Sequence, residues 1–280
     1  MAQVPPVRRR RVAGAAVRAT AVAPRAWRWV SAGRRGFPDF IVLGAQRAGT
    51  TSLYQWVTAH DQVTPATSKE VHYFDLNYEK GERWYRSHFP LSRPGRITGE
   101  ASPYLLYHPL SPRRAGHDLP SSTRFVAVLR HPVQRALSHY WHERRMKAET
   151  ESLEKALALE GQRLAGEDEA FRRGERSFAH FHYSYEARGR YAEQLSRWFE
   201  AVGRHRILVV ESEALFVDPD VQAEVARWLG LGAASTPFPA LNEAARTEAV
   251  PDAVVRSLEA RFEAPNEKLF ALLGRRLWGR

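Results

Sequence analysis

The chain has 280 residues, 44% of them hydrophobic and 26% charged, a composition typical of a globular protein with a sizeable core. It contains no cysteine, which excludes disulfides, thiolate metal sites and cysteine nucleophiles. The formal net charge is +11, and nine of the 42 basic residues lie within the first 35 residues, where there is no acidic residue. The other 245 residues carry 33 basic and 31 acidic groups, so the body of the protein lacks the charge of a nucleic-acid-binding surface.

Residues 1–36 are rich in alanine, arginine, valine and proline. Their apolar runs are too short for a membrane span or for the apolar stretch of a secretory signal. We therefore expect a basic, disordered N-terminal extension followed by a single domain over 37–280. A transit peptide and a tether for anionic surfaces are alternative interpretations of the extension. Because no other segment is apolar enough to cross a membrane, we expect a cytoplasmic protein with no transmembrane segment.

Apolar runs and amphipathic helical patterns alternate along the rest of the chain. Three runs have the length of buried strands: 39–43, 125–129 and 207–210. Helical patterns begin at Thr51 and Pro132 and cover 191–202 and 221–229. This alternation predicts an α/β fold with a P-loop-like central parallel sheet flanked by helices on both faces.

Three segments outside this alternation have simpler interpretations. Residues 147–180 are charged and helix-prone, and we expect them to form an exposed excursion from the sheet. Residues 232–251 have no apolar period and are predicted to be a long loop. The chain is then expected to end in a pair of helices divided at Pro265.

The connection between the first strand and its helix has the features of a phosphate-binding loop. It reads Gly44-Ala45-Gln46-Arg47-Ala48-Gly49-Thr50-Thr51-Ser52-Leu53. At such a connection, backbone N–H groups and the start of the helix converge on an anion. Gly44 and Gly49 have the spacing of the nucleoside-triphosphate signature, but Thr50 stands at the position of its lysine. The cation of this loop is Arg47, which favours two anionic groups over a triphosphate.

A second cationic residue is expected at the same edge of the sheet. Arg130 follows the strand at 125–129, and Ser138 lies two turns into the next helix. Because ligands of such folds bind beyond the carboxyl ends of the strands, Arg130 would lie beside the 44–52 loop. Its guanidinium is suited to a second phosphate group.

Together these segments resemble the sulfotransferases that use 3′-phosphoadenosine 5′-phosphosulfate (PAPS), most closely the branch of heparan sulfate and bacterial carbohydrate sulfotransferases. Residues 47–53 match the family pattern [KR]-x-G-T-x-x-L, and residues 130–138 match R-x-P-x-x-R-x-x-S. Residues 69–75 look like the family's K-E-x-H-[FY]-F-D motif, and residues 99–104 look like its segment near the acceptor. The resemblance covers roughly residues 38–275.

The resemblance implies a site for PAPS and a transfer of its sulfuryl group to a hydroxyl or amine of a carbohydrate or small-molecule acceptor. The implied donor-binding residues are Arg47, Ala48, Gly49, Thr50, Thr51, Ser52, Arg130 and Ser138, with Arg246 as a further contact of the 3′-phosphate. Glu70 is the implied catalytic base, and His72 is the second candidate for that role. No metal is implied, because the histidines are not accompanied by a ligand pattern.

The sequence departs from the family at two positions that bear on chemistry. Arg47 stands where many members have lysine, and arginine stabilises charge but does not release its proton at neutral pH. Ala101 stands where glycosaminoglycan enzymes often have lysine, which weakens the case for a polyanionic acceptor. Two other functions are therefore kept as alternatives: a P-loop kinase or NTPase, and a non-catalytic nucleotide-binding member of the fold.

Overall fold

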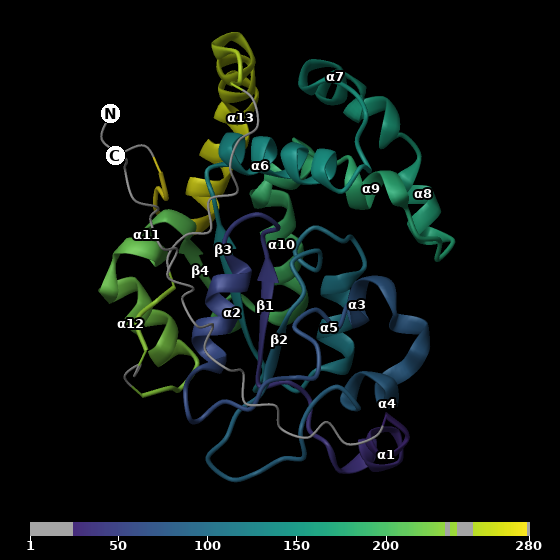
Figure 1. Ribbon diagram of the computed structural model, residues 1–280, viewed down its shortest axis with the longest axis vertical. Helices are drawn as coiled ribbons and strands as arrows, with labels where there is room; N and C mark the ends of the chain where they lie inside the picture. The colour runs from purple at the N-terminus through teal and green to yellow at the C-terminus, as the bar shows by residue number, and fades with distance from the viewer. Residues whose placement is uncertain (1–24, 233–235, 240–248, 279–280) are drawn as a thin grey trace, which may run out of the picture.

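The computed structural model describes residues 25–232, 236–239 and 249–278. Its centre is a parallel four-stranded sheet with the order β2-β1-β3-β4 (Figure 1). The strands are β1 (Phe40–Gly44), β2 (Gly99–Ala101), β3 (Arg124–Leu129) and β4 (Ile207–Glu211). In register, Ile41 of β1 lies opposite Glu100 of β2 and Phe125 of β3. The α/β fold with a central parallel sheet is confirmed, and the three predicted strands agree to within one residue at each end.

Strand β2 was not predicted, because it has only three residues and its middle one is a glutamate. Hydrogen bonding to β1, rather than an apolar run, holds it at the edge of the sheet. All three residues are buried, and a side chain at Gly99 would lie 2.3 Å from the carbonyl oxygen of Phe40. The close approach of the neighbouring strand therefore requires glycine at this position.

Helices cover both faces of the sheet, as the sequence predicted. In Figure 1, α2 (Thr50–Thr58) crosses in front of the strands, whereas α5 (Ser111–Asp118) and α10 (Tyr191–Val202) lie behind them. The other helices are α1 (Arg25–Val30), α3 (Tyr73–Leu76), α4 (Gly81–Arg86), α6 (Pro132–Arg145), α7 (Leu153–Arg163), α8 (Glu167–Arg172), α9 (Phe178–His182), α11 (Ser212–Val217), α12 (Pro219–Trp228) and α13 (Asp252–Leu273). Short 3₁₀ turns lie at Ser31–Arg34, Tyr78–Lys80, Ala187–Gly189 and Arg204–Arg206. Among the described residues, no helix has the length and apolar character needed to cross a membrane.

The segment expected to be an exposed excursion forms α7, α8 and α9, which Figure 1 shows beside α6 and away from the sheet. It is nevertheless anchored, because Leu153, Ala156 and Leu157 join a second hydrophobic cluster with residues of α6 and α13. In the predicted loop 232–251, the described residues belong to no helix or strand, and the others lie outside the described residues.

The expected division of the last helix at Pro265 was wrong. Residues Asp252–Leu273 form one continuous helix that contains the proline. Leu258 lies in the second cluster and Leu269 in the main core, so the helix is buried on both sides of Pro265. Packing of both halves outweighs the local cost of an interior proline.

The expectation of disorder up to residue 36 was wrong for residues 25–36. They form α1 and a 3₁₀ turn, and Arg35 is buried. The Arg28 guanidinium donates to the carbonyl oxygens of Ser87 (2.7 Å) and Phe89 (2.8 Å), and Arg35 donates to the latter at 2.6 Å. Arg28 and Arg35, whose charge suggested a solvated tail, thus donate hydrogen bonds to backbone carbonyl groups just after α4. Residues 1–24 lie outside the described residues.

Candidate active site

The loop after β1 leads the chain into α2 with a conformation that depends on glycine. Gly49 has a φ of 88°, and a side chain there would lie 2.6 Å from the Phe216 ring. Gly49 is also the N-cap of α2, where no described side chain caps the helix. The first N–H groups of α2 are therefore available to an anionic ligand. Thr50 and Ser52 are buried at this start, Thr51 is exposed, and Ala48 within the loop is buried.

Three of the predicted donor-binding residues meet beside this loop. Arg47 donates from Nε to Oγ of Ser138 on α6 at 3.1 Å. Arg130, at the end of β3, donates to the carbonyl oxygen of Arg47 at 3.4 Å. Burial lowers the pKa of Arg47, and the nearby charges of Arg145 and Arg130 lower it further. Cations held this close to one another form a site that favours an anion.

Arg130 also has an anionic neighbour that the sequence did not indicate. Its Nε lies 3.4 Å from Oε1 of Glu213, and its Nη2 donates to Gln134 at 3.2 Å. The other carboxylate oxygen of Glu213 is buried and has no hydrogen-bond partner among the described residues. The guanidinium is thus held between α6 and α11, beside a carboxylate that would repel a phosphate.

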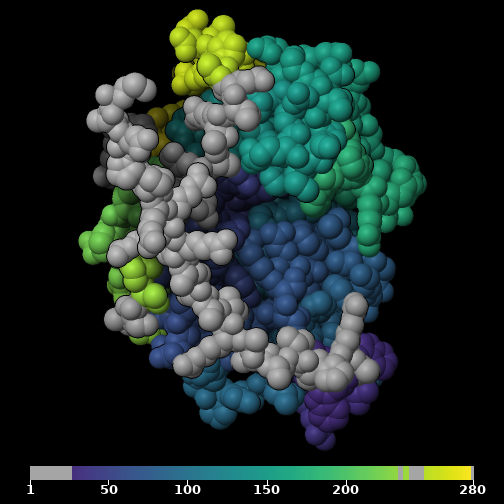
Figure 2. All heavy atoms as spheres, viewed as in Figure 1, coloured from purple at the N-terminus to yellow at the C-terminus, as the bar shows by residue number. Residues whose placement is uncertain are grey.

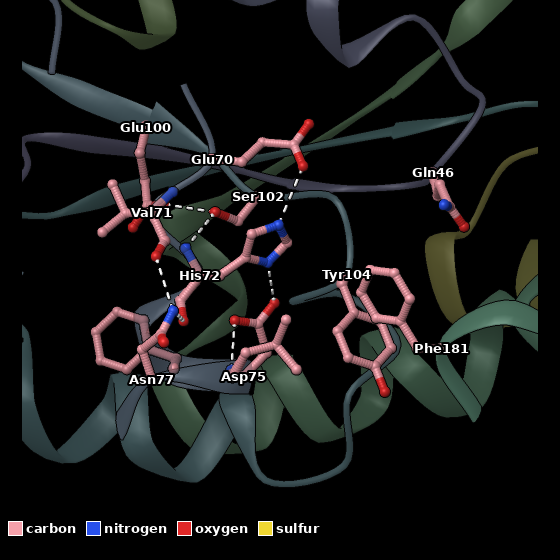
Figure 3. Close-up of polar contacts among 12 residues, drawn as sticks. Gln46, Glu70, Val71, His72, Asp75, Asn77, Glu100, Ser102, Tyr104 and Phe181 are labelled. Carbon is pink, nitrogen blue, oxygen red and sulfur yellow. Dashed lines mark hydrogen bonds and ion pairs between the residues drawn. The ribbon is translucent and has the colours of Figure 1, made fainter. Parts of the chain in front are cut away.

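On the other side of the loop, Glu70 and His72 form a polar chain with Asp75 (Figure 3). Glu70 Oε1 lies 2.6 Å from Nζ of Lys69, and Glu70 Oε2 lies 3.1 Å from Nε2 of His72. The other ring nitrogen of His72 lies 2.7 Å from Oδ2 of Asp75, whose side chain is fully buried. Glu70 is itself half-exposed, so its carboxylate is accessible to an acceptor.

The protonation states of Glu70 and His72 depend on their contacts with each other, with Lys69 and with Asp75. Burial alone would raise the pKa of Glu70, but hydrogen bonding to His72 and the charge of Lys69 lower it to about 2. Burial alone would lower the pKa of His72, but Asp75 and Glu70 raise it to about 10. At neutral pH, His72 is therefore protonated between two carboxylates. An imidazolium in this state does not accept a proton, whereas ionised Glu70 does.

Buried Glu100 of β2 positions the segment that carries Glu70 and His72. Its carboxylate accepts hydrogen bonds from Tyr85 Oη (2.6 Å), Ser102 Oγ (2.6 Å) and the N–H of Val71 (3.2 Å). Ser102 in turn accepts the N–H of His72 at 3.0 Å. His72 needs this support because its φ is 54°, in the left-handed region. The 69–72 segment is thereby fixed at the carboxyl end of β2.

Buried Arg188 connects the phosphate loop to the Glu70 side of the site. It donates to Gln46 Oε1, to the carbonyl oxygen of Phe181 (2.6 Å), and lies 4.8 Å from the ring centre of Tyr104. Phe181 lies edge-on to His72, with ring centres 6.4 Å apart. Figure 3 shows Gln46, Tyr104 and Phe181 together on one side of the Glu70–His72–Asp75 chain. Tyr104 is buried, whereas Gln46 and Phe181 are partly exposed on this side of His72.

The structure therefore places two groups of predicted residues at neighbouring strand ends: Arg47, Arg130 and Ser138 beside β1 and β3, and Glu70 and His72 beside β2. Arg246 lies outside the described residues. Sequence reasoning missed Glu100 and Arg188 as positioning residues. Residues 99–104 resemble a family segment that includes Glu100, but this resemblance does not indicate burial or hydrogen-bond partners. Arg188 falls within the span of the resemblance, 38–275, and nothing in that span indicates its contacts.

The protonation of His72 predicts a specific pH dependence of stability. Its pKa is about 10 in the folded chain and about 6.5 when unperturbed. The stabilisation by protonated His72 is complete below pH ~6.5 and is lost as the pH rises through about 10. Urea unfolding should show the largest stability difference between wild type and His72→Gln near pH 6, with a steady decrease toward pH 10. A difference that stays constant over this range would show that folded His72 is neutral.

Comparison with known proteins identifies relatives over most of the chain. Residues 37–248 match the family described as Sulfotransferase domain. Mouse heparan sulfate glucosamine 3-O-sulfotransferase 6 is 30% identical over 269 residues, which cover 86% of this chain and 73% of the mouse protein. The bifunctional heparan sulfate N-deacetylase/N-sulfotransferase 1 of Caenorhabditis elegans is 27% identical over 205 residues, covering 71% of this chain and 22% of that protein. The solved structure of a sulfotransferase from Alicyclobacillus acidocaldarius has a TM-score of 0.68 at 28% identity and covers 86% of this chain and 97% of its own.

Proposed function

This chain belongs to the sulfotransferase family, and on that premise we propose that it transfers a sulfuryl group from PAPS to a hydroxyl or amine of a carbohydrate, with Glu70 as the general base. Enzymes of this family use PAPS as donor, and the chain is a PAPS-dependent sulfotransferase. The observation that carries the proposed mechanism is the juxtaposition of two sites. A cation cluster around Arg47 lies at the ends of β1 and β3, and an ionised carboxylate buttressed by His72 lies at the end of the adjacent strand β2.

The residues of the phosphate loop are suited to the donor. The start of α2 and the Arg47 guanidinium would hold the 5′-phosphosulfate, and Arg130 with Ser138 would hold the 3′-phosphate. Arg47 stabilises the negative charge that develops on the phosphate oxygen when its bond to sulfur breaks. Because an arginine keeps its proton, this contribution is electrostatic rather than general-acid catalysis.

Glu70 would accept the acceptor's proton as the new bond to sulfur forms, while adenosine 3′,5′-bisphosphate leaves on the opposite side. Protonated His72, held by Asp75, keeps the carboxylate in place during this step. The Lys69 ammonium contacts Glu70 at 2.6 Å. An anionic donor bound beside it would attract this ammonium away from Glu70. Loss of that contact raises the pKa of Glu70 toward its ordinary value and makes it a stronger base.

The class of acceptor is inferred from the wall of the site and from the relatives. The partly exposed ring of Phe181 lies beside His72 and packs on buried Tyr104, and partly exposed Gln46 adds an amide. Rings of this kind contact the apolar faces of sugars while polar groups bind their hydroxyls. The mouse relative is named as an O-sulfotransferase and the C. elegans relative as an N-sulfotransferase, both of heparan sulfate. Both kinds of acceptor atom are therefore included in the proposal.

The test is a transfer assay that measures release of adenosine 3′,5′-bisphosphate from PAPS. The acceptors are an N-sulfated heparan oligosaccharide, its de-N-sulfated counterpart with free amines, a neutral oligosaccharide and a simple phenol. We expect release with at least one carbohydrate and a sulfated product by mass spectrometry. Turnover with the phenol alone would overturn the carbohydrate acceptor. Nucleotide binding without turnover on any acceptor would favour the non-catalytic alternative.

A further inference from the structure

The short helix α1 is packed with its charged side toward the protein and its aromatic side toward solvent. Arg28 is half-buried and donates to two backbone carbonyl oxygens of the segment after α4. On the opposite side, Trp27 and Trp29 are 56% and 52% exposed, and Val30 is 65% exposed. The hydrophobic effect favours the reverse arrangement in an isolated domain. The outward face of α1 is therefore suited to an apolar partner.

These side chains belong to a larger patch, which we call the tryptophan patch: Trp27, Trp29, Val30 and Leu91. Leu91 is 42% exposed and pairs through a β-bridge with Arg35, and the segment that leads to Leu91 accepts the hydrogen bonds of Arg28 in α1. Four of the seven exposed large apolar side chains among the described residues lie in this patch. Such concentration of exposed apolar side chains marks an interaction surface more often than chance exposure.

Cationic side chains lie close to the patch. The guanidinium of Arg83 lies 4.6 Å from the ring centre of Trp29, and Arg34 is exposed in the turn after α1. The nearby acid Glu82 is paired with Arg86 at 2.7 Å. Residues 1–24, which precede the patch in sequence, contain five arginines and no acidic residue. The partner of this surface is therefore expected to be anionic as well as apolar.

We propose that the tryptophan patch docks the enzyme on an anionic lipid surface. Tryptophan side chains partition to the boundary between headgroups and acyl chains, and arginines beside them bind anionic headgroups. Exposed Val30 and Leu91 fit this boundary, whereas they have no polar or stacking role on a nucleic acid. The proposal concerns a surface separate from the catalytic site and does not depend on the acceptor.

Docking in this way leaves the catalytic site open. Residues 25–39 precede β1 and lie at the amino ends of the strands, whereas Arg47, Arg130 and Glu70 lie at or beside the carboxyl ends. Figure 1 shows α1 near the lower end of the molecule, away from the heads of the strand arrows, and Figure 2 shows the same purple segment at the lower end of this face. An enzyme docked through the patch would present its active site away from the lipid surface, toward an acceptor in solution.

The test is vesicle flotation of the full chain and of a Trp27→Ser/Trp29→Ser double variant. The vesicles contain either phosphatidylcholine alone or phosphatidylcholine with phosphatidylserine. The matched control is Met146→Ser/Val217→Ser, which removes two other exposed apolar side chains, 65% and 78% exposed. Binding of adenosine 3′,5′-bisphosphate checks that each variant is folded.

We expect the wild type and the control to bind the anionic vesicles, and the tryptophan variant to bind them at least about tenfold more weakly. Wild-type binding should also weaken in the neutral vesicles and at high salt. No flotation of the wild type, or equal flotation of the tryptophan variant, would overturn the proposal. A dimer that disappears in the tryptophan variant without any lipid binding would also overturn it, and would assign the patch to a second copy of the chain.

Discussion

Glu70→Gln should lower the turnover number by about 10²- to 10⁴-fold, the range expected for loss of a general base. Glutamine retains the size of the side chain and can still contact His72, so the local packing is preserved. It cannot take the acceptor's proton. Because Glu70 is not among the groups that surround Arg47 and Arg130, the affinity for adenosine 3′,5′-bisphosphate should change little. The measurements are the transfer rate at saturating PAPS and calorimetric binding of the bisphosphate.

The matched control is Glu79→Gln, which neutralises a nearby exposed carboxylate that is paired with Arg176. It should retain wild-type turnover. Glu70→Gln turnover within tenfold of wild type would contradict the assignment of the base. His72→Gln provides the second comparison. If His72 only positions Glu70, the His72→Gln enzyme should retain some activity, and this activity should fall further when Glu70 is also replaced by glutamine. Equal, non-additive losses in both single variants and in their double variant would show that the two side chains act as one unit.

How far the sequence predicts this fold depends on whether each element contains its own signal. Strands β1, β3 and β4 consist mainly of consecutive apolar residues that are largely buried in the sheet, and such runs can be recognised in the amino-acid sequence alone. Strand β2 has no such run, because its middle residue is Glu100. The burial of this carboxylate is made possible by hydrogen bonds from Tyr85 and Ser102, which a run of apolar residues does not indicate. At Pro265 the local sequence predicts a break that the fold does not have. The helix-breaking tendency of proline is outweighed by the packing of the helix on both sides of it.

The candidate site shows the same division. The phosphate loop and the Arg130–Ser138 segment are contiguous patterns, so their meeting at one edge of the sheet follows from the parallel topology. Arg188 reaches Gln46 across 142 positions of sequence, and only the folded chain brings them together. Composition alone predicts that the arginines near the N-terminus are solvated. Composition does not distinguish a solvated Arg28 from one that donates to two backbone carbonyl oxygens.

Arg130→Ala should weaken the binding of adenosine 3′,5′-bisphosphate by about 10- to 150-fold, the loss expected for a charged hydrogen-bonding group of about 1.5–3 kcal/mol. Isothermal calorimetry measures it. ATP with magnesium should bind weakly to both proteins, because the loop has Thr50 at the position of the triphosphate-binding lysine. Preference of the wild type for magnesium-ATP would favour the kinase alternative.

The ion pair between Arg130 and Glu213 allows a second test, because replacing its two members should change the affinity for the bisphosphate in opposite directions. Glu213→Gln removes an anion 3.4 Å from the Arg130 guanidinium and should tighten bisphosphate binding severalfold. The exposed pair Arg172 and Glu169, 2.8 Å apart on α8, provides charge-matched controls, and Arg172→Ala and Glu169→Gln should leave the affinity unchanged. Weaker binding in both Arg130→Ala and Glu213→Gln would mean that the pair acts by holding the loop in place. Normal binding by Arg130→Ala would exclude Arg130 from the nucleotide site, whatever the effect of Glu213.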